Sequence, residues 1–292
     1  LGALQGIGAR AHGLPVDHNG LIPEALEEVL QKAKATGDSD RIKALYLTTY
    51  FDNPSSITTS QKRREEIFEI VSRYNHQQHR LYIIEDAAYR DLRYFGEDIP
   101  SLFSLDLENK TVVYTSSFSK SFSPGLRVGW GVLPNDLVAP LSHHQGNMNF
   151  GAPHFSQQVI RQVIEGGDFD LHLAKLRLTY QKKLETMVSA AEEYLGDLTE
   201  VSWLPAAGGL YIWLKLDGVD TGTEGPLFPR ALEKGVLYVP GYYCYPTEGS
   251  PPAHDQIRLS FGVQSVDRIK QGMQLLSDAI RETLAQKEPQ YQ

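Results

Sequence analysis

The stretch that decides the fold is Ser116-Ser117-Phe118-Ser119-Lys120-Ser121-Phe122-Ser123-Pro124-Gly125-Leu126-Arg127-Val128-Gly129-Trp130. A β-branched and aromatic run at residues 111–115 precedes it, and a second apolar run at residues 128–133 overlaps its end. Short apolar runs of this kind, bounded by polar and turn-forming residues, predict buried strands. Lys120 and Arg127 therefore lie in a polar connection between two predicted strands.

Outward from this stretch, the first half of the chain alternates between apolar runs and helical patterns. Predicted strands cover residues 44–50, 81–85, 111–115 and 128–133. Between the first two, Ile67, Ile70 and Val71 repeat at helical spacing behind the start signal Thr58-Thr59-Ser60, which predicts a helix over residues 60–76. This alternation indicates an α/β fold with a mostly parallel sheet flanked by helices.

The second half of the chain has a different rhythm. A long helical pattern over residues 168–195 leads into predicted strands at residues 210–216, 236–239 and 257–261. A final amphipathic helix follows, with Val266, Ile269 and Met273 on its apolar face. We therefore expect a large domain over residues 1–165 and a small C-terminal α+β domain over residues 166–292.

Composition narrows the classes of partner. A formal net charge of −8 over 292 residues argues against a nucleic acid as the main partner and favours small-molecule substrates. The single cysteine, Cys244, cannot form an internal disulfide, which fits a reducing compartment. No apolar run reaches the ~18 residues of a membrane span. We expect a cytoplasmic protein without a membrane partner.

No pattern in the sequence predicts a metal site. No Cys/His clusters have the spacing of structural zinc, and His76 and His79, three residues apart, lack a third ligand. We expect an exposed helix end at that pair.

The chain opens with Leu1-Gly2-Ala3-Leu4-Gln5, which lacks a methionine and resembles the middle of a domain. We expect an N-terminal segment of the large domain to precede it.

Polar residues follow the predicted strands at the positions where ligands gather in open α/β sheets. They are Asn53-Pro54, Asp86 with Tyr89, the run Ser116–Lys120, and Arg127 just before the last strand. Each alone has an ordinary explanation, such as a turn, a helix cap or a solvated surface charge. Their combination, in this order, is the informative signal.

These motifs resemble those of the fold type I, pyridoxal-phosphate-dependent aminotransferases of class I and II. The resemblance is carried by Tyr50-Phe51-Asp52-Asn53-Pro54, Asp86-Ala87-Ala88-Tyr89, the lysine stretch through Trp130, Gly208-Gly209, Val239-Pro240-Gly241 and Ile257-Arg258-Leu259-Ser260-Phe261. It is closest to the group acting on 2-aminoadipate and aromatic amino acids. It implies a large domain that binds pyridoxal 5'-phosphate, amino-group transfer from an L-amino acid to a 2-oxo acid, and a homodimer.

The resemblance also implies roles for single residues. Lys120 would form the Schiff base with the cofactor and, once displaced by substrate, shuttle the proton at the α-carbon, a double role that needs a neutral amine. Asp86 would keep the pyridine nitrogen protonated. Asn53 and Tyr89 would hydrogen-bond the ring hydroxyl. Lys120, Asp86 and Tyr89 are thus the predicted catalytic residues.

The remaining predicted contacts hold anions. Ser117, Ser119 and Arg127 would bind the phosphate of the cofactor. Arg258, together with Asn53, would bind the substrate, with the guanidinium clamping the α-carboxylate by a two-pronged contact that lysine cannot match.

The chain departs from the family pattern at one motif, and two other functions remain open. Asp52 and Ser55-Ser56 replace the usual glutamine and threonine-glycine around Asn53-Pro54. The added negative charge would disfavour acidic substrate side chains.

Because fold does not fix chemistry, a pyridoxal-phosphate lyase is an alternative function. So is the ligand-sensing domain of a transcription regulator with an upstream DNA-binding segment.

Overall fold

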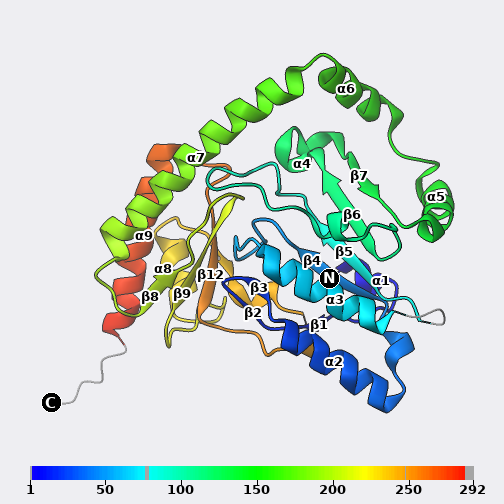
Figure 1. The fold of residues 1–292 in the computed structure, drawn as a ribbon. Helices are drawn as coiled ribbons and strands as arrows, with labels where there is room; N and C mark the ends of the chain where they lie inside the picture. The colour runs from blue at the N-terminus through cyan, green and yellow to red at the C-terminus, as the bar shows by residue number, and fades with distance from the viewer. Residues whose placement is uncertain (1, 76–78, 247, 287–292) are drawn as a thin grey trace. The chain divides into compact units, whose positions relative to one another are not determined.

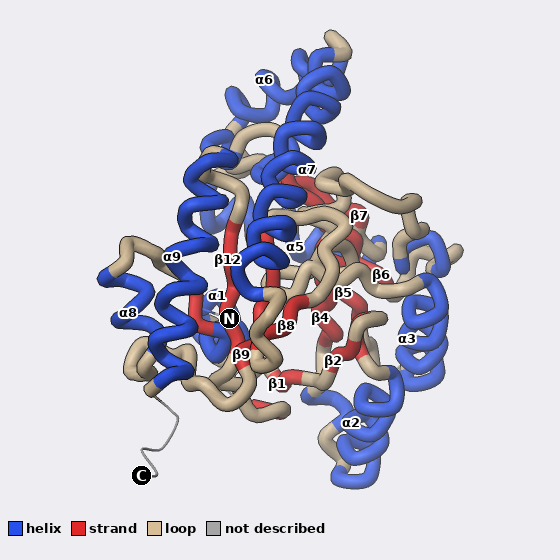
Figure 2. Tube along the Cα trace, turned by 90° about the vertical axis from the view of Figure 1, so that its left-hand side faces the viewer, coloured by secondary structure: helices blue, strands red, loops and turns tan. Residues whose placement is uncertain are grey.

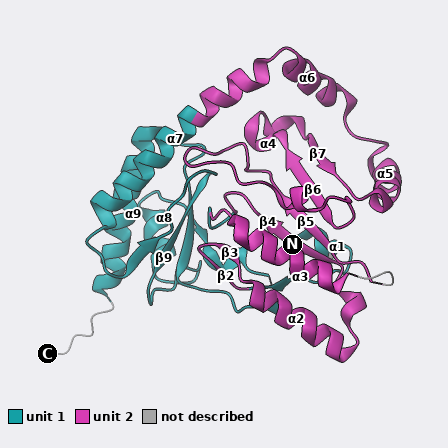
Figure 3. Cartoon of the chain, viewed as in Figure 1, with its two compact units in different colours: residues 1–14, 53–56, 178–292 teal, residues 15–52, 57–177 magenta. Residues whose placement is uncertain are grey.

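The computed structural model describes residues 2–75, 79–246 and 248–286, and the chain forms two compact units (Figure 3). Unit 1 comprises Leu1–Leu14, Asn53–Ser56 and Leu178–Gln292, and unit 2 comprises Pro15–Asp52 and Ile57–Arg177. The long helix α7, Asp168–Leu195, runs from unit 2 into unit 1.

A four-stranded sheet organises unit 2 (Figure 1). Its order is β4 (Ala44–Thr48), β5 (Tyr82–Asp86), β6 (Val112–Ser117) and β7 (Gly129–Val132). The first three strands are parallel and β7 is antiparallel to β6. The mostly parallel sheet predicted from the sequence is thereby confirmed. Asp86 pairs with Thr48 on one side and Thr115 on the other, so the carboxyl ends of three strands meet at one edge.

Helices cover one side of this sheet, with α3 next to the strands and α2 next to α3 (Figures 1 and 2). α3 begins after Ser60, whose hydroxyl accepts from the Arg63 N–H, and it buries Ile67, Ile70 and Val71. The other elements of unit 2 are β2 (Val16–Asp17), β3 (Gly20–Leu21), α2 (Pro23–Thr36), α3 (Gln61–Tyr74), α4 (Phe118–Ser121), α5 (Asn135–Asn149) and α6 (His154–Glu165).

Two predicted elements end earlier than expected. The strand over residues 44–50 stops at Thr48, which lies opposite Asp86 at the end of β5. The next carbonyl, that of Thr49, accepts from the Thr59 N–H at 3.0 Å and from Arg64 at 2.9 Å instead of extending the sheet. The helix over residues 60–76 ends at Tyr74, and His76 lies outside the described residues. The Asn75 side chain then exchanges two hydrogen bonds with the backbone of Leu81, which turns the chain back toward β5.

Unit 1 is built on an antiparallel sheet of order β10-β12-β9-β8, with the second part of α7, α8 and α9 on one face (Figures 1 and 2). The Ser277 hydroxyl of α9 donates to the Tyr194 carbonyl of α7 at 2.7 Å. The elements are α1 (Gly2–Gly6), β1 (His12–Gly13), β8 (Val201–Trp203), β9 (Tyr211–Leu216), α8 (Leu227–Glu233), β10 (Val239–Pro240), β11 (Glu248–Gly249), β12 (Gln256–Ser260) and α9 (Val266–Ala285).

The predicted strand over residues 236–239 is reduced to β10, because the Val236 amide donates to the Ala231 carbonyl and closes the end of α8 instead. Across residues 2–75, 79–246 and 248–286, none of the helices combines the length and apolar character that crossing a bilayer requires.

A fully buried ion pair lies beneath the sheet of unit 2. Arg64 of α3 and Glu85 of β5 are both 0% exposed, with 3.4 Å between Nη1 and Oε1. Arg64 also donates to three backbone carbonyls, those of Thr49, Thr59 and Pro100, each at 2.9 Å. The guanidinium therefore ties the helix to the end of β4 and to a distant loop.

Glu85 is equally well supplied with donors. Its carboxylate accepts from the Thr49 hydroxyl at 2.8 Å and from the backbone N–H groups of Leu102 and Phe103 at 3.1 and 3.2 Å. The ring of Tyr50 lies 4.2 Å from the Arg64 guanidinium. A buried pair with these added bonds is costly to break from one side, since the remaining charge keeps its desolvation penalty.

We predict that Arg64→Met lowers the free energy of unfolding of the whole protein by about 3–5 kcal/mol, because Glu85 would remain buried without its cation. Arg73→Met is the matched control on the same helix. Arg73 pairs with Glu27 at 3.2 Å and is 53% exposed, so its loss should cost under about 1 kcal/mol. Chemical denaturation of both variants measures the difference. Equal, small losses would contradict the assigned role of Arg64.

Candidate functional site

Asp86, the last residue of β5, is the centre of the candidate site in unit 2. Its Oδ1 accepts from the Ala88 N–H at 3.0 Å, and its Oδ2 accepts from the Tyr46 hydroxyl at 2.5 Å. The second distance is short for a hydrogen bond from a hydroxyl to a carboxylate. Both oxygens therefore have one donor each, and the carboxylate has a defined orientation at the carboxyl edge of the sheet.

Tyr46 is a residue of the site that no motif in the sequence indicates. β4 and β5 are parallel with Thr48 opposite Asp86, and Tyr46 lies two residues before Thr48 on the same face. A diagonal neighbour on one sheet face is within reach of a long aromatic side chain. The strand register, had it been known, would have predicted the contact.

Desolvation of the hydroxyl, and next its hydrogen bond to Asp86, raise the pKa of Tyr46. Because the residue as a whole is 60% exposed, the hydrogen bond to the carboxylate is the firmer of the two causes. The phenol thus keeps its proton and remains a donor at neutral pH.

Lys120 lies in the short helix α4 that follows β6. Its ammonium nitrogen is 5.6 Å from the centroid of the Tyr89 ring, and Tyr89 is buried. Within the described part of the chain, no carboxylate oxygen lies within 4.0 Å of this ammonium. Phe118, on the same helix, packs edge-on against Phe169 at 5.8 Å between ring centroids. Lys120 is therefore a cation without an acidic partner on a packed turn.

The hydroxyls and the arginine near Lys120 form a second group. Ser117 caps α4 by accepting from the Ser119 N–H at 3.0 Å. Arg127 donates to the Ser119 hydroxyl at 3.4 Å and to the Pro124 carbonyl at 3.2 Å. Its backbone is left-handed, with φ of 53° and ψ of 38°, a conformation that costs free energy in a non-glycine residue and recurs at binding sites.

Unit 1 contains the other two predicted residues. Arg258 of β12 donates through Nη1 to the Asn53 side-chain oxygen at 2.7 Å, and its guanidinium carbon lies 4.5 Å from the Tyr211 ring centroid. Its Nε is buried and has no hydrogen-bond partner among the described residues. A buried, unsatisfied guanidinium N–H is costly, so the arrangement favours an acceptor that this chain does not supply.

The Asn53-Pro54-Ser55-Ser56 turn shows the consequence of its missing glycine. Ser56 has a left-handed backbone with φ of 58°, a conformation that glycine adopts at little cost. Its hydroxyl donates to the Tyr211 carbonyl at 2.6 Å, which offsets part of that cost. The turn thus keeps its shape with a serine in place of glycine. The Ser56 hydroxyl also fixes it to Tyr211, the first residue of β9.

The predicted residues fall into two sets. Unit 2 contains the carboxylate, the lysine and its neighbours, namely Asp86, Tyr89, Ser117, Ser119, Lys120 and Arg127. Among these, Lys120 contacts Tyr89, and Ser119 contacts both Ser117 and Arg127. Unit 1 brings together Asn53 and Arg258. In the described residues, no group of three or more His, Cys, Asp or Glu side chains is arranged to hold a metal ion.

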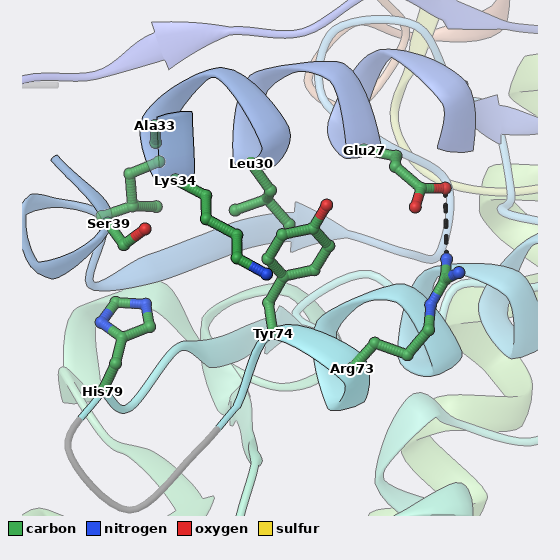
Figure 4. Close-up of a pocket in the computed structure, with 9 residues that line it drawn as sticks. Glu27, Leu30, Ala33, Lys34, Ser39, Arg73, Tyr74 and His79 are labelled. Atoms are coloured by element: carbon green, nitrogen blue, oxygen red, sulfur yellow. Dashed lines mark hydrogen bonds and ion pairs between the residues drawn. The ribbon is translucent and has the colours of Figure 1, made fainter. Parts of the chain in front are cut away.

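A cavity of about 250 Å³ elsewhere in unit 2 contains none of these residues (Figure 4). α2 supplies Glu27 and Lys34 to its wall, and α3 supplies Arg73, whose guanidinium pairs with Glu27. His79 also lines it. The expectation of an exposed helix end at His79 is wrong, since this residue is 5% exposed, follows α3 and lies 3.3 Å from Asp40. The cavity lies outside the candidate site.

Comparison with known proteins gives a consistent family. A family model described as aminotransferase class I and II matches residues 9–276. The aromatic-amino-acid aminotransferase 1 of Thermococcus litoralis is 30% identical over 272 residues, which are 93% of this chain and 61% of that protein. An uncharacterized HTH-type transcriptional regulator, YdfD of Bacillus subtilis, is 31% identical over 97% of this chain and 54% of its own length.

Among solved structures, a kynurenine aminotransferase of Pyrococcus horikoshii, determined with PMP, superposes with a TM-score of 0.84 at 31% identity. The match covers 93% of this chain and 63% of that one. The chain thus spans less than two thirds of the length of each of these relatives.

Proposed function

Because the chain belongs to the class I and II aminotransferase family, we propose that the whole protein transfers an amino group from an L-amino acid to a 2-oxo acid, with pyridoxal 5'-phosphate as its cofactor. The observation that carries the proposal is Lys120, a cation with no acidic partner among the described residues, placed beside Tyr89 just after β6. Asp86 stands at the end of the adjacent parallel strand.

The residues of unit 2 fit this cofactor on their own chemistry. Lys120 and Arg127 are two cations that lack a carboxylate partner in the described part of the chain, and the hydroxyls of Ser117 and Ser119 lie in the same connection. Such a group suits a phosphate and an aldehyde. Asp86 supplies a carboxylate with a defined orientation, which suits a protonated ring nitrogen.

When bound, the cofactor would supply a ring that accepts electrons from the substrate α-carbon. Lys120 would hold it covalently and, once released by substrate, move the proton at the α-carbon as a neutral amine. Asp86 would keep a proton on the ring nitrogen by the attraction of its charge. Tyr89 and Asn53 would donate to the ring hydroxyl and so fix the tilt of the ring.

Anion binding is assigned to the arginines. Arg127, with Ser117 and Ser119, would hold the phosphate. Arg258 would clamp the substrate carboxylate, since its buried Nε lacks an acceptor while Nη1 is already fixed by Asn53. A planar guanidinium held at one nitrogen presents its remaining N–H groups in a fixed direction, which suits a carboxylate.

The organisation of the whole protein is proposed on the same basis. Residues 1–165 would belong to the cofactor-binding large domain and residues 166–292 to the small one. In the structure, the chain passes from unit 2 to unit 1 within α7, after Arg177. A homodimer is proposed from the resemblance. The exposed apolar side chains of Met148, Phe150 and Phe155 in unit 2 support it, since such groups mark interfaces. The proposed compartment is the cytoplasm, given a single cysteine.

Product analysis tests the proposed function against its two rivals. The whole protein should convert a 2-oxo acid to its amino acid only when an L-amino acid donor is present, and Lys120→Ala should lose this activity. Release of ammonia and pyruvate without a 2-oxo acid would identify a lyase. Cofactor binding without turnover of any donor would favour the sensing domain of a regulator, the class to which the Bacillus relative is assigned.

We predict that Arg258→Lys raises KM for the amino acid by about 10- to 100-fold, equivalent to the roughly 1.5–3 kcal/mol of a hydrogen bond to a charged group. Lysine keeps the charge but loses the planar fork, so cofactor affinity should stay unchanged. Steady-state kinetics with a donor amino acid measures the change. An amine without a carboxylate is the control substrate and should not respond. Loss of cofactor affinity instead would make Arg258 structural.

A further inference from the structure

The Tyr46 hydroxyl is a side-chain contact of the Asp86 carboxylate that the proposed mechanism does not yet use. It donates to Oδ2 at 2.5 Å, although 60% of the residue as a whole is exposed. β4 and β5 already pair over five residues through their backbones. The phenol is therefore not needed to hold the strands together. Its hydrogen bond acts on the orientation of the Asp86 carboxylate.

Two donors reach this carboxylate from different directions. The Ala88 N–H bonds Oδ1 from the turn after β5, and the Tyr46 hydroxyl bonds Oδ2 from the neighbouring strand. A carboxylate oxygen can accept a second hydrogen bond, so one lone pair on each oxygen remains available. Without Tyr46, a single backbone donor would remain, and the carboxylate could rotate about it.

The charges around the phenol keep it a donor. Desolvation of the hydroxyl, then the hydrogen bond to Asp86 and the charge of Asp86, raise the pKa of Tyr46. A side-chain hydrogen bond with Thr48 lowers it by less, and the carboxylate of Asp52 after β4 raises it slightly. Both named acidic neighbours disfavour a phenolate. The positive end of the hydroxyl dipole therefore points at Asp86 throughout the neutral pH range.

We propose that Tyr46 is a positioning residue that holds the Asp86 carboxylate toward the ring nitrogen of the cofactor. This inference rests on the proposed function, because it assigns the partner of Asp86 in that site. A group that hydrogen-bonds a functional side chain fixes its orientation, and losing that group typically costs about 10- to 100-fold in binding or activity.

The test is Tyr46→Phe in the whole protein loaded with pyridoxal 5'-phosphate. Tyr82→Phe is a matched control, because the Tyr82 hydroxyl donates to the Asp136 carboxylate at 2.7 Å from the adjacent strand. The main measurement is the pH titration of the visible absorption of the bound cofactor. Loss of the hydroxyl dipole strengthens the negative field of Asp86 and favours the cationic form of the lysine linkage, so the midpoint should rise by about 0.5–1 pH unit.

We also expect kcat to fall about tenfold in Tyr46→Phe, as for other partners of a reacting group, with cofactor affinity changed less than about threefold. Tyr82→Phe should match the parent in titration and kcat. Parent-like titration of Tyr46→Phe, or an equal shift in Tyr82→Phe, overturns the role of Tyr46 and leaves the proposed function intact. A parent protein that gains no visible absorption with the cofactor overturns both.

Discussion

The fold of unit 2 depends on the buried contact between Arg64 and Glu85. Two full charges without solvent access are tolerated because every polar contact around them is satisfied, by three carbonyls on one side and by a hydroxyl and two amides on the other. The pair fixes the end of β5. Side chains alternate along a strand, so a buried Glu85 directs the next residue, Asp86, to the opposite face, where the candidate site lies.

Charge is distributed unequally between the buried pair of Arg64 and Glu85 and the carboxyl edge of the sheet. Beneath the sheet the arginine and the glutamate neutralise each other, whereas Lys120 and Arg127 at the carboxyl edge have no carboxylate partner among the described residues. Arg127 also holds a left-handed backbone. Cations without an acidic partner favour the binding of an anion. A strained backbone on a rigid support is also typical of a binding site.

The sequence predicted the strands and the residues at their ends, because apolar runs and the lysine stretch are local patterns. It did not predict that Arg64 is buried, since a charged residue in a helix is normally assigned to solvent. It also did not predict the contact of Tyr46 with Asp86, which depends on the register of two strands. It also did not predict the early end of β4, because the Thr49 carbonyl accepts from Thr59 and Arg64, and a local pattern does not indicate these partners.

Locating the covalent bond between the protein and its cofactor tests the role of Lys120 most directly. The whole protein would be treated with pyridoxal 5'-phosphate, reduced with borohydride, digested and examined by mass spectrometry. We expect one modified peptide, the one that contains Lys120, and none in Lys120→Ala. Modification at Lys32, Lys34, Lys43 or Lys110 instead, or an unchanged adduct in the Lys120 variant, would contradict this role.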